Sequence, residues 1–302
     1  MNAPRRPPGR AVDGVLLLDK ALGITSNGAL QSARRLYNAL KAGHTGTLDP
    51  LATGLLPLCF GEATKFSAYL LDADKRYRAV LRLGVTTSTG DPEGEVLNTR
   101  DPAVSCDDIS AVLPRFIGEI EQIPPMHSAL KHQGRPLYEY ARAGIEIERP
   151  PRKVRIRTLE MIECAPPRVV LDVQCSAGTY IRTLAQDIGA ALGCGAHLTS
   201  LQRTASGGFL LEQAHTLPDL EMLDAGQRQA LLLPADCLVA HLPAIHLDAA
   251  EAEALCQGRN VAYPATQPGL ARVYTTSHRF IGLADVDTGH LVPRRLIATQ
   301  PT

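Results

Sequence analysis

Apolar and polar positions in the first ninety residues follow two periods. A short apolar run over residues 14–20 ends in a charge and predicts a strand. Residues 76–83 alternate between the two classes, which predicts a half-buried strand with Tyr77 on its apolar side. Between them a helix is expected to begin at Ser26 or Asn27 and to end at Gly43. Its apolar stripe is formed by Ala29, Ala33, Leu36, Tyr37 and Leu40.

The most unusual stretch separates that helix from the second strand. Residues 43–57 contain three glycines and two prolines, so we expect a compact loop there instead of a regular element. A Pro-bracketed, basic segment at about residues 124–152 has the character of an insertion.

Elements of both types continue in the second half. Residues 169–175 predict a strand, and Gly178 precedes a helix that ends at Gly193. The acidic stretch to about residue 246 is expected to be helical and connecting, and short strands follow within residues 272–293. Because strands and helices mix without regular β–α–β alternation, the predicted class is α+β.

Composition narrows the class of protein. The chain has 302 residues, of which 45% are hydrophobic and 21% are charged, enough for a sizeable core in one large or two ordinary domains. No apolar run approaches the roughly 20 residues that cross a bilayer, so no membrane helix is expected. The arginine pair within residues 1–12 is not followed by the apolar segment of an export signal, so an export signal is not expected there. We expect these residues to form a flexible arm.

Charge is segregated along the chain although the formal net charge is zero. Between residues 127 and 157 there are eight basic residues and three acidic ones, whereas residues 212–253 hold eight acidic residues and one arginine. Such a chain can present a cationic face to a nucleic acid, although two ordinary solvated faces are the alternative.

The seven cysteines and the missing motifs exclude several chemistries. The cysteines are at least eleven residues apart and form no C-x-x-C or Cys/His cluster, so we expect reduced cytoplasmic thiols and no metal site. Phosphate-binding loops, dinucleotide fingerprints, H-E-x-x-H and G-x-S-x-G motifs are absent from the sequence. The chemistry is therefore expected to need no cofactor.

Four residues are candidates for chemistry, each with an ordinary alternative. Asp49 lies among leucines, where a carboxylate needs a cation or N–H donors, or simply holds its own turn. Arg182 lies in the first turn of its helix, where the helix dipole disfavours a cation and suggests an acidic partner, although a solvated surface arginine is the common alternative. His44 could bind backbone in a turn, and Tyr77 could be a core aromatic.

Five ordered blocks closely resemble the bacterial TruB family, the stand-alone tRNA pseudouridine-55 synthases. They are residues 14–20, 42–54 (AGHTGTLDPLATG), 61–66, 74–77 and 176–182 (SAGTYIR), and the likeness continues through 123–130 and 201–207 into the tail. It covers nearly the whole chain from about residue 12. The resemblance implies a pseudouridine-synthase fold, with a mixed, mainly antiparallel sheet flanked by helices and loops, and a small β-rich PUA-like domain.

The resemblance also implies roles for residues. Asp49 matches the family's nucleophile, Arg182 its ion-pair partner, and Tyr77 the ring that stacks on the target uracil. For this chemistry we expect a two-pronged Arg182 contact that keeps the carboxylate ionised, and the Tyr77 hydroxyl is a candidate base for the proton on C5, directly or through water. His44 matches the residue that helps to displace the target base, and Tyr180 and Leu201 match residues that line the uridine pocket. Contacts to the RNA backbone are expected from Lys20, Lys131, Arg135, Arg149 and Arg152.

The implied organisation is a catalytic domain over residues 13–245, with the RNA-clamping insertion inside it, and an RNA-binding domain over residues 246–302. The expected partner is the tRNA T stem-loop, with no protein partner required, a monomer and a cytoplasmic location. Two other functions remain open: a catalytic subunit that depends on a guide RNA, and a non-catalytic chaperone for tRNA folding.

Overall fold

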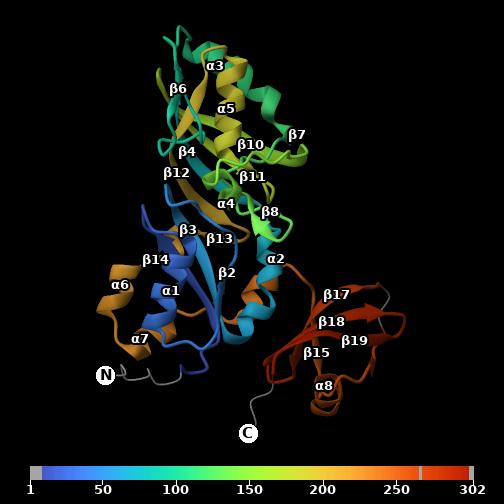
Figure 1. Ribbon diagram of the computed structural model, residues 1–302. Coiled ribbons are helices and arrows are strands. Elements are labelled where there is room, and N and C mark those ends of the chain that lie inside the picture. Colours follow the sequence, from blue (N-terminus) through green and yellow to red (C-terminus); the bar gives the residue numbers. More distant parts are fainter. Residues whose placement is uncertain (1–8, 265–266, 299–302) are drawn as a thin grey trace.

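The computed structural model describes residues 9–264 and 267–298 (Figure 1). Residues 1–8 of the expected arm lie outside these ranges. The adjoining residues pack on the body, since the backbone N–H of Arg10 donates to Asn38 O at 2.7 Å and Val12 is buried. No helix in the described ranges is long and apolar enough to cross a membrane.

A mixed, mainly antiparallel sheet forms the centre of the molecule, as the α+β prediction requires. Its strands run in the order β14-β1-β3-β12-β4-β11-β10-β7, and β2 and β13 pair at its margins. Only β14 with β1 and β12 with β3 are parallel among these described strands. The strands are β1 (Gly14–Lys20), β2 (Ala42–His44), β3 (Ala52–Phe60), β4 (Lys75–Leu83), β7 (Gly118–Gln122), β10 (Arg152–Ala165), β11 (Arg168–Cys175), β12 (Ala196–Ser206), β13 (Phe209–Leu210) and β14 (His215–Thr216).

The two faces of the sheet bury different helices. Because side chains alternate along a strand, Leu16 and Leu18 of β1 enter one hydrophobic core, and Val15 and Leu17 enter another. The first core also receives α1 (Ser26–Leu36) and α5 (Ile181–Ala191), which cross the same face. The second core receives η1 (Gly61–Lys65), α2 (Ser67–Leu71) and η4 (Ala235–Val239).

The predicted helix after β1 is confirmed, but it is shorter than expected. Thr25 caps α1 through its side chain, and the helix ends after Leu36 because Asn38 adopts a left-handed conformation with φ of 49°. Leu40 is consequently exposed.

The prediction that residues 43–57 form a loop is wrong at both ends, since Gly43 and His44 belong to β2 and the residues from Ala52 onward belong to β3. Residues 52–60 form β3, which is paired with β1 on one side and β12 on the other and is buried almost throughout. Local Gly and Pro signals are overridden because this strand is central in the sheet. Gly54 has φ of +95°, and a Cβ there would lie 2.4 Å from Arg203 O, so this crossing with β12 requires glycine.

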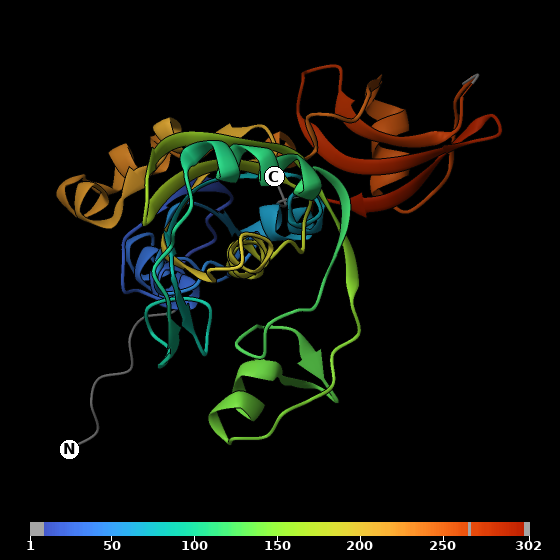
Figure 2. The ribbon, with the colours of Figure 1, turned by 90° about the horizontal axis from the view of Figure 1, so that it is seen from above.

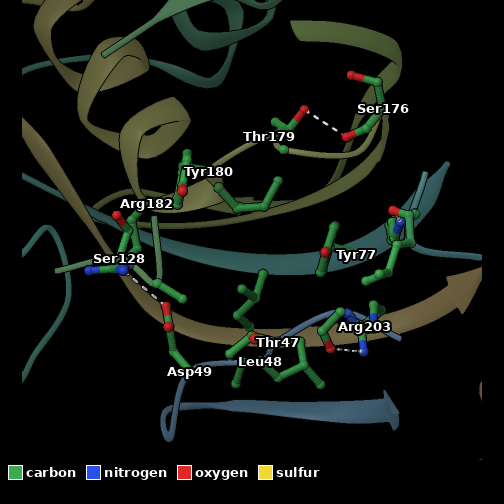
Figure 3. A pocket seen from close by; sticks show the side chains of 18 residues that line it. Thr47, Leu48, Asp49, Tyr77, Ser128, Ser176, Thr179, Tyr180, Arg182 and Arg203 are labelled. Atoms are coloured by element: carbon green, nitrogen blue, oxygen red, sulfur yellow. Dashed lines mark hydrogen bonds and ion pairs between the residues drawn. The ribbon is translucent and has the colours of Figure 1, made fainter. Parts of the chain in front are cut away.

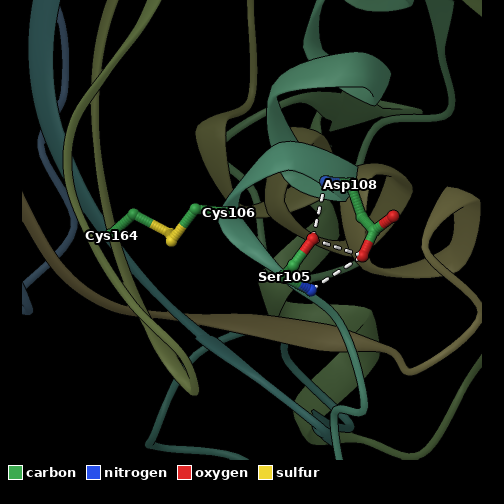
Figure 4. The surroundings of a disulfide bond; sticks show 4 residues. All are labelled: Ser105, Cys106, Asp108 and Cys164. Carbon is green, nitrogen blue, oxygen red and sulfur yellow. Dashed lines mark hydrogen bonds between the residues drawn. A yellow bond between two sulfur atoms is a disulfide. The ribbon is translucent and has the colours of Figure 1, made fainter.

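A disulfide joins Cys106, at the start of α3 (Cys106–Val112), to Cys164 near the end of β10 (Figure 4). The expectation of reduced thiols is therefore wrong for this pair. The two cysteines are 58 residues apart, and only packing of α3 beside β10 brings their Cα atoms to 6.0 Å. Ser105 and Asp108 form a capping box at the same helix end.

The segment closed by this disulfide contains the basic insertion, which stands apart from the sheet when seen from above (Figure 2). It has little regular structure. The remaining small elements between β4 and β10 in the sequence are β5 (Val85–Thr87), β6 (Val96–Thr99), η2 (Leu113–Phe116), β8 (Lys131–His132), β9 (Arg135–Pro136) and α4 (Leu137–Arg142).

The acidic segment is helical and connecting, as predicted, and leads to a separate sheet. Its elements are η3 (Leu211–Gln213), α6 (Leu217–Met222) and α7 (Ala225–Ala230). The second sheet has the order β15-β17-β18-β19-β16 and carries one helix beside it. These elements are β15 (Ala244–Leu247), α8 (Ala249–Cys256), β16 (Val261–Ala262), β17 (Gly269–Thr275), β18 (Phe280–Asp287) and β19 (His290–Leu296).

The C-terminal sheet shares a hydrophobic core with the central sheet. Leu283 of β18 is buried in the same cluster as Val15 and Leu17 of β1. The rings of Phe66 and Phe280 lie 5.4 Å apart between the two units. The two sheets therefore pack directly on each other.

Candidate active site

The turn between β2 and β3 carries Asp49 and is fixed to the start of α1. Ser26 Oγ donates to Leu48 O at 2.9 Å and accepts from Leu48 N at 2.7 Å, and this hydroxyl is buried. Within the turn, Ala52 N donates to Asp49 O at 3.0 Å. The residue before the carboxylate is thus held at both backbone atoms, which limits how far Asp49 can move.

Two buried cations support the same turn from below. Lys20 Nζ donates to Ile24 O at 2.7 Å and reaches Pro50 O at 3.5 Å. Arg203 Nη2 donates to Gly46 O in the turn at 3.3 Å, and its Nε donates to Leu55 O of β3 at 2.6 Å. Each residue is only 1% exposed. Burial lowers the pKa of Lys20 to about 8, although the nearby Asp49 carboxylate acts in the opposite direction. The prediction that Lys20 contacts an RNA backbone is wrong, because carbonyl oxygens enclose its ammonium.

Arg182 links Asp49 to a second carboxylate. Its Nη2 lies 3.1 Å from Asp49 Oδ2 (Figure 3). Its Nη1 lies 3.4 Å from Asp91 Oδ2. The guanidinium also donates to Thr89 O at 3.1 Å and to His127 O at 2.6 Å. The expected ion pair therefore forms, but the expected two-pronged contact does not, since the two arms of the arginine bind different carboxylates.

The three charged groups differ in their exposure to solvent. The side chains of Arg182 and Asp91 are 7% and 6% exposed, whereas that of Asp49 is 44% exposed. Asp91 anchors the arginine from within, and Asp49 presents its carboxylate to an open space. Sequence reasoning missed Asp91, because only the fold brings the turn after β5 against α5.

A cavity of about 280 Å³ opens beside Asp49 and Arg182. Tyr77 of β4, Leu201 of β12 and Tyr180 at the start of α5 line it. Figure 3 shows Tyr77 and Tyr180 in this cavity with Asp49 and Arg182. Five of the residues predicted for catalysis or substrate binding thus line one space. An aromatic ring, an apolar side chain and a carboxylate around such a volume suit a flat, polar-edged ligand.

Burial raises the pKa of Tyr77 and that of Tyr180. Both phenols are therefore protonated at neutral pH and act as hydrogen-bond donors or as stacking surfaces. A role for Tyr77 as a base would require a phenolate, which its surroundings disfavour.

His44 lies on the other side of the ion pair. A second hollow of about 490 Å³ is lined by His44, Asn27, Tyr138 and Arg142, and it also reaches Asp49 and Arg182. Burial lowers the pKa of His44, so its ring is neutral at physiological pH, and its Nδ1 atom is buried without a hydrogen-bond partner among the described residues. The predicted site residues thus divide between two hollows that meet at Asp49.

The basic residues predicted to contact RNA differ in availability. Lys131 in β8, Arg135 in β9 and Arg152 at the start of β10 are exposed, and Arg135 pairs with Glu139 at 3.3 Å. Arg149 is different, because its side chain is only 19% exposed and contacts Glu146 at 3.3 Å. The acidic helices α6 and α7 lie on another side of the molecule from the insertion (Figures 1 and 2).

Among the described residues, no three His, Cys, Asp or Glu side chains form a group that could hold a metal ion.

Three family models match successive parts of this chain. The TruB family pseudouridylate synthase (N terminal domain) matches residues 34–181, and the tRNA pseudouridylate synthase B C-terminal domain matches residues 182–240. A further model, Pseudouridine synthase II TruB, C-terminal, matches residues 243–297.

Curated relatives match over their full lengths. The tRNA pseudouridine synthase B of Thiobacillus denitrificans is 72% identical over 294 residues, which cover 97% of this chain and 99% of the relative. The protein of the same name from Azoarcus sp. is 58% identical over 98% of each chain.

Solved structures with the same fold are chains of multi-component complexes. A chain of a Cbf5-Nop10-Gar1 complex is 30% identical with a TM-score of 0.70, over 90% of this chain and 78% of that one. A chain of an H/ACA RNP bound to a substrate RNA containing 2′-deoxyuridine is 27% identical with a TM-score of 0.72, over 95% and 85%.

Proposed function

Because this chain belongs to the TruB family of pseudouridylate synthases, we propose that it converts the T-loop uridine of tRNA to pseudouridine with Asp49 as the nucleophile. The observation that carries this proposal is the Asp49–Arg182 ion pair beside a cavity lined by Tyr77, Tyr180 and Leu201. The cavity would hold the uracil ring, with Tyr77 stacked on its face and Asp49 near the glycosidic bond.

The reaction is redox-neutral and can be carried by side chains alone. The N1–C1′ bond breaks, the C5–C1′ bond forms, the proton on C5 leaves and N1 takes up a proton. Asp49 can assist by attacking the sugar carbon, by promoting elimination to a glycal, or by adding to the uracil ring. In each route Arg182 orients the carboxylate, and Tyr77 retains the detached base while it turns.

A uridine inside a base stack cannot reach this cavity, so the base must be flipped, at a cost of a few kcal/mol. We propose that His44, in the adjoining hollow, occupies the space that the base leaves. Its neutral ring can enter a base stack without the cost of removing a charge from water.

Tritium release tests the proposed reaction directly. Purified protein is incubated with T-arm RNA that carries tritium at C5 of the target uridine, and release into water is followed. We expect stoichiometric release by the native protein. We expect loss of turnover in Asp49→Asn with tRNA affinity unchanged within a few fold. Residual turnover above a few per cent in that variant would contradict the role of Asp49.

We further propose that the insertion clamps phosphates of the T stem-loop. This proposal rests on Lys131 and Arg135, because both are exposed on the insertion. The insertion stands apart from the sheet (Figure 2). Replacing both by alanine should weaken RNA binding. The slope of the logarithm of the binding constant against the logarithm of the salt concentration should fall in magnitude by the amount that corresponds to about two phosphate contacts. The rate at saturating RNA should stay unchanged. Arg168→Ala, an exposed change at the far end of the sheet, is the charge control. An unchanged salt slope would exclude the clamp.

We propose that residues 13–245 form the catalytic domain and that residues 246–302 form a PUA-like domain that adds contacts to the RNA. The enzyme would act as a monomer in the cytoplasm without a protein partner. The likeness to H/ACA structures favours a guide-dependent subunit as the second candidate. Turnover of a bare T-arm RNA by the isolated chain would exclude it, and turnover would equally exclude a purely chaperone function.

A further inference from the structure

Gln122 contacts the backbone at the start of α5 through both atoms of its amide. Its Oε1 accepts from Tyr180 N at 3.0 Å, and its Nε2 donates to Tyr180 O at 3.2 Å. The side chain is 3% exposed. A buried glutamine whose amide pairs with both the N–H and the C=O of one residue fixes the backbone of that residue in position and orientation.

The helix needs this support because it lacks a cap of its own. Tyr180 is the N-cap residue of α5, and its side chain makes no capping hydrogen bond. Its carbonyl also accepts from Leu184 N at 3.0 Å, as the first bond of the helix. Gln122, from a different element, accepts the N–H of this N-cap residue, as the N3 side chain does in a capping box, at the residue whose ring lines the cavity.

Two functional groups depend on this point of the helix. Gln122 holds the backbone of Tyr180, whose ring lines the cavity. Arg182 follows two residues later, in the first turn of α5. Arg182 Nη2 must lie within 3.1 Å of Asp49 and 2.6 Å of His127 O. A rotation of the first turn would break these contacts together.

Gln122 also stands at the foot of the insertion. It is the last residue of β7, and it pairs across the sheet with Arg152, the first residue of β10. The insertion leaves and rejoins the sheet at this pair. Gln122 therefore lies where the insertion joins the sheet.

We propose that Gln122 is a positioning residue for isomerisation, which sets Tyr180 and Arg182 by holding the backbone of the N-cap residue of α5. This inference rests on the proposed synthase activity. It predicts a specific defect: loss of the amide lowers the rate of the chemical step at saturating RNA, whereas RNA affinity changes little.

The test uses the full chain and two substitutions of Gln122. Gln122→Met keeps the length of the side chain and removes both hydrogen bonds. Gln122→Glu keeps an acceptor for Tyr180 N and changes the group that faces Tyr180 O. The control is Leu113→Ala, which removes a buried side chain from η2 at the same edge of the sheet, outside the site. Single-turnover tritium release, RNA dissociation constants and melting temperatures are measured for all.

We expect at least a tenfold lower saturating rate for Gln122→Met, a smaller loss for Gln122→Glu, and dissociation constants within threefold of the native value. Leu113→Ala should melt at lower temperature with a rate within twofold. A Gln122→Met rate within twofold, or a rate loss equal to that of a control with the same melting temperature, would overturn the proposal. If Gln122→Met does not fold, an unaltered rate in Gln122→Glu overturns it. Failure of the native protein to release tritium would instead refute the synthase activity.

Discussion

Replacing Arg182 by methionine should distinguish the effects of its two ion pairs. The pair with Asp91 should determine stability, and the pair with Asp49 should determine the catalytic rate. Asp91 and Arg182 are almost completely buried together, so removing one partner leaves an unpaired buried charge, which costs about 3–5 kcal/mol of stability. Asp49 is 44% exposed, and water can solvate its carboxylate once the arginine is gone. Most of the stability loss should therefore come from Asp91.

The catalytic loss should come from the other contact. A hydrogen bond to a charged group contributes about 1.5–3 kcal/mol, which corresponds to a rate loss of about 10- to 150-fold if it is fully used in the transition state. The double variant Arg182→Met with Asp91→Asn removes the buried charge as well. It should regain most of the stability while the rate remains low.

Urea unfolding and single-turnover tritium release at saturating RNA measure the two quantities separately. A stability loss below about 1 kcal/mol in the single variant would refute the argument from the buried charge. Recovery of the native rate in the double variant would show that Arg182 acts on Asp91 alone and that its contact with Asp49 is incidental.

Three further predictions concern the framework of the site. Lys20 binds more protons in the unfolded chain, where a lysine has pKa 10.5, than in the folded chain between pH 8 and 10.5, so it contributes stability that rises with pH over that range; Lys20→Met should therefore lower the slope of the unfolding free energy against pH, as urea unfolding at each pH will show. Gly54→Ala should destabilise the protein by more than about 1 kcal/mol in thermal melts, because its Cβ would meet the backbone of β12, whereas Gly43→Ala, with open space, should have a smaller effect. Reducing Cys106–Cys164 frees a 58-residue loop and should cost about 4 kcal/mol, observed as a lower melting temperature with dithiothreitol.

Sequence patterns predicted the elements whose side chains follow one period. The alternation from residue 76 to 83 and the stripe after Gly178 correspond to β4 and α5. The strand β3 was missed because its Gly and Pro content resembles a loop, and its strand conformation comes from pairing on both sides. Local propensity carries no information about such pairing.

The candidate site shows the same division. Asp49 and Arg182 are 133 residues apart, and only the family resemblance connected them before the structure placed them 3.1 Å apart. Asp91, Ser26 and Arg203 were missed because each acts through one tertiary contact that no spacing reveals. The assignment of Lys20 to RNA failed for the same reason, since a lysine in sequence does not disclose its burial.

The core shared by the two sheets has a consequence for how the protein meets a long substrate. Because Leu283 and Phe280 are packed against β1 and Phe66, the C-terminal unit cannot swing away without exposing apolar surface to water. The distance from the cavity at Asp49 to the outer face of that unit is then constant. A tRNA that contacts both the cavity and that outer face must therefore match a fixed spacing. Its second contact forms at a high effective concentration once the first is made.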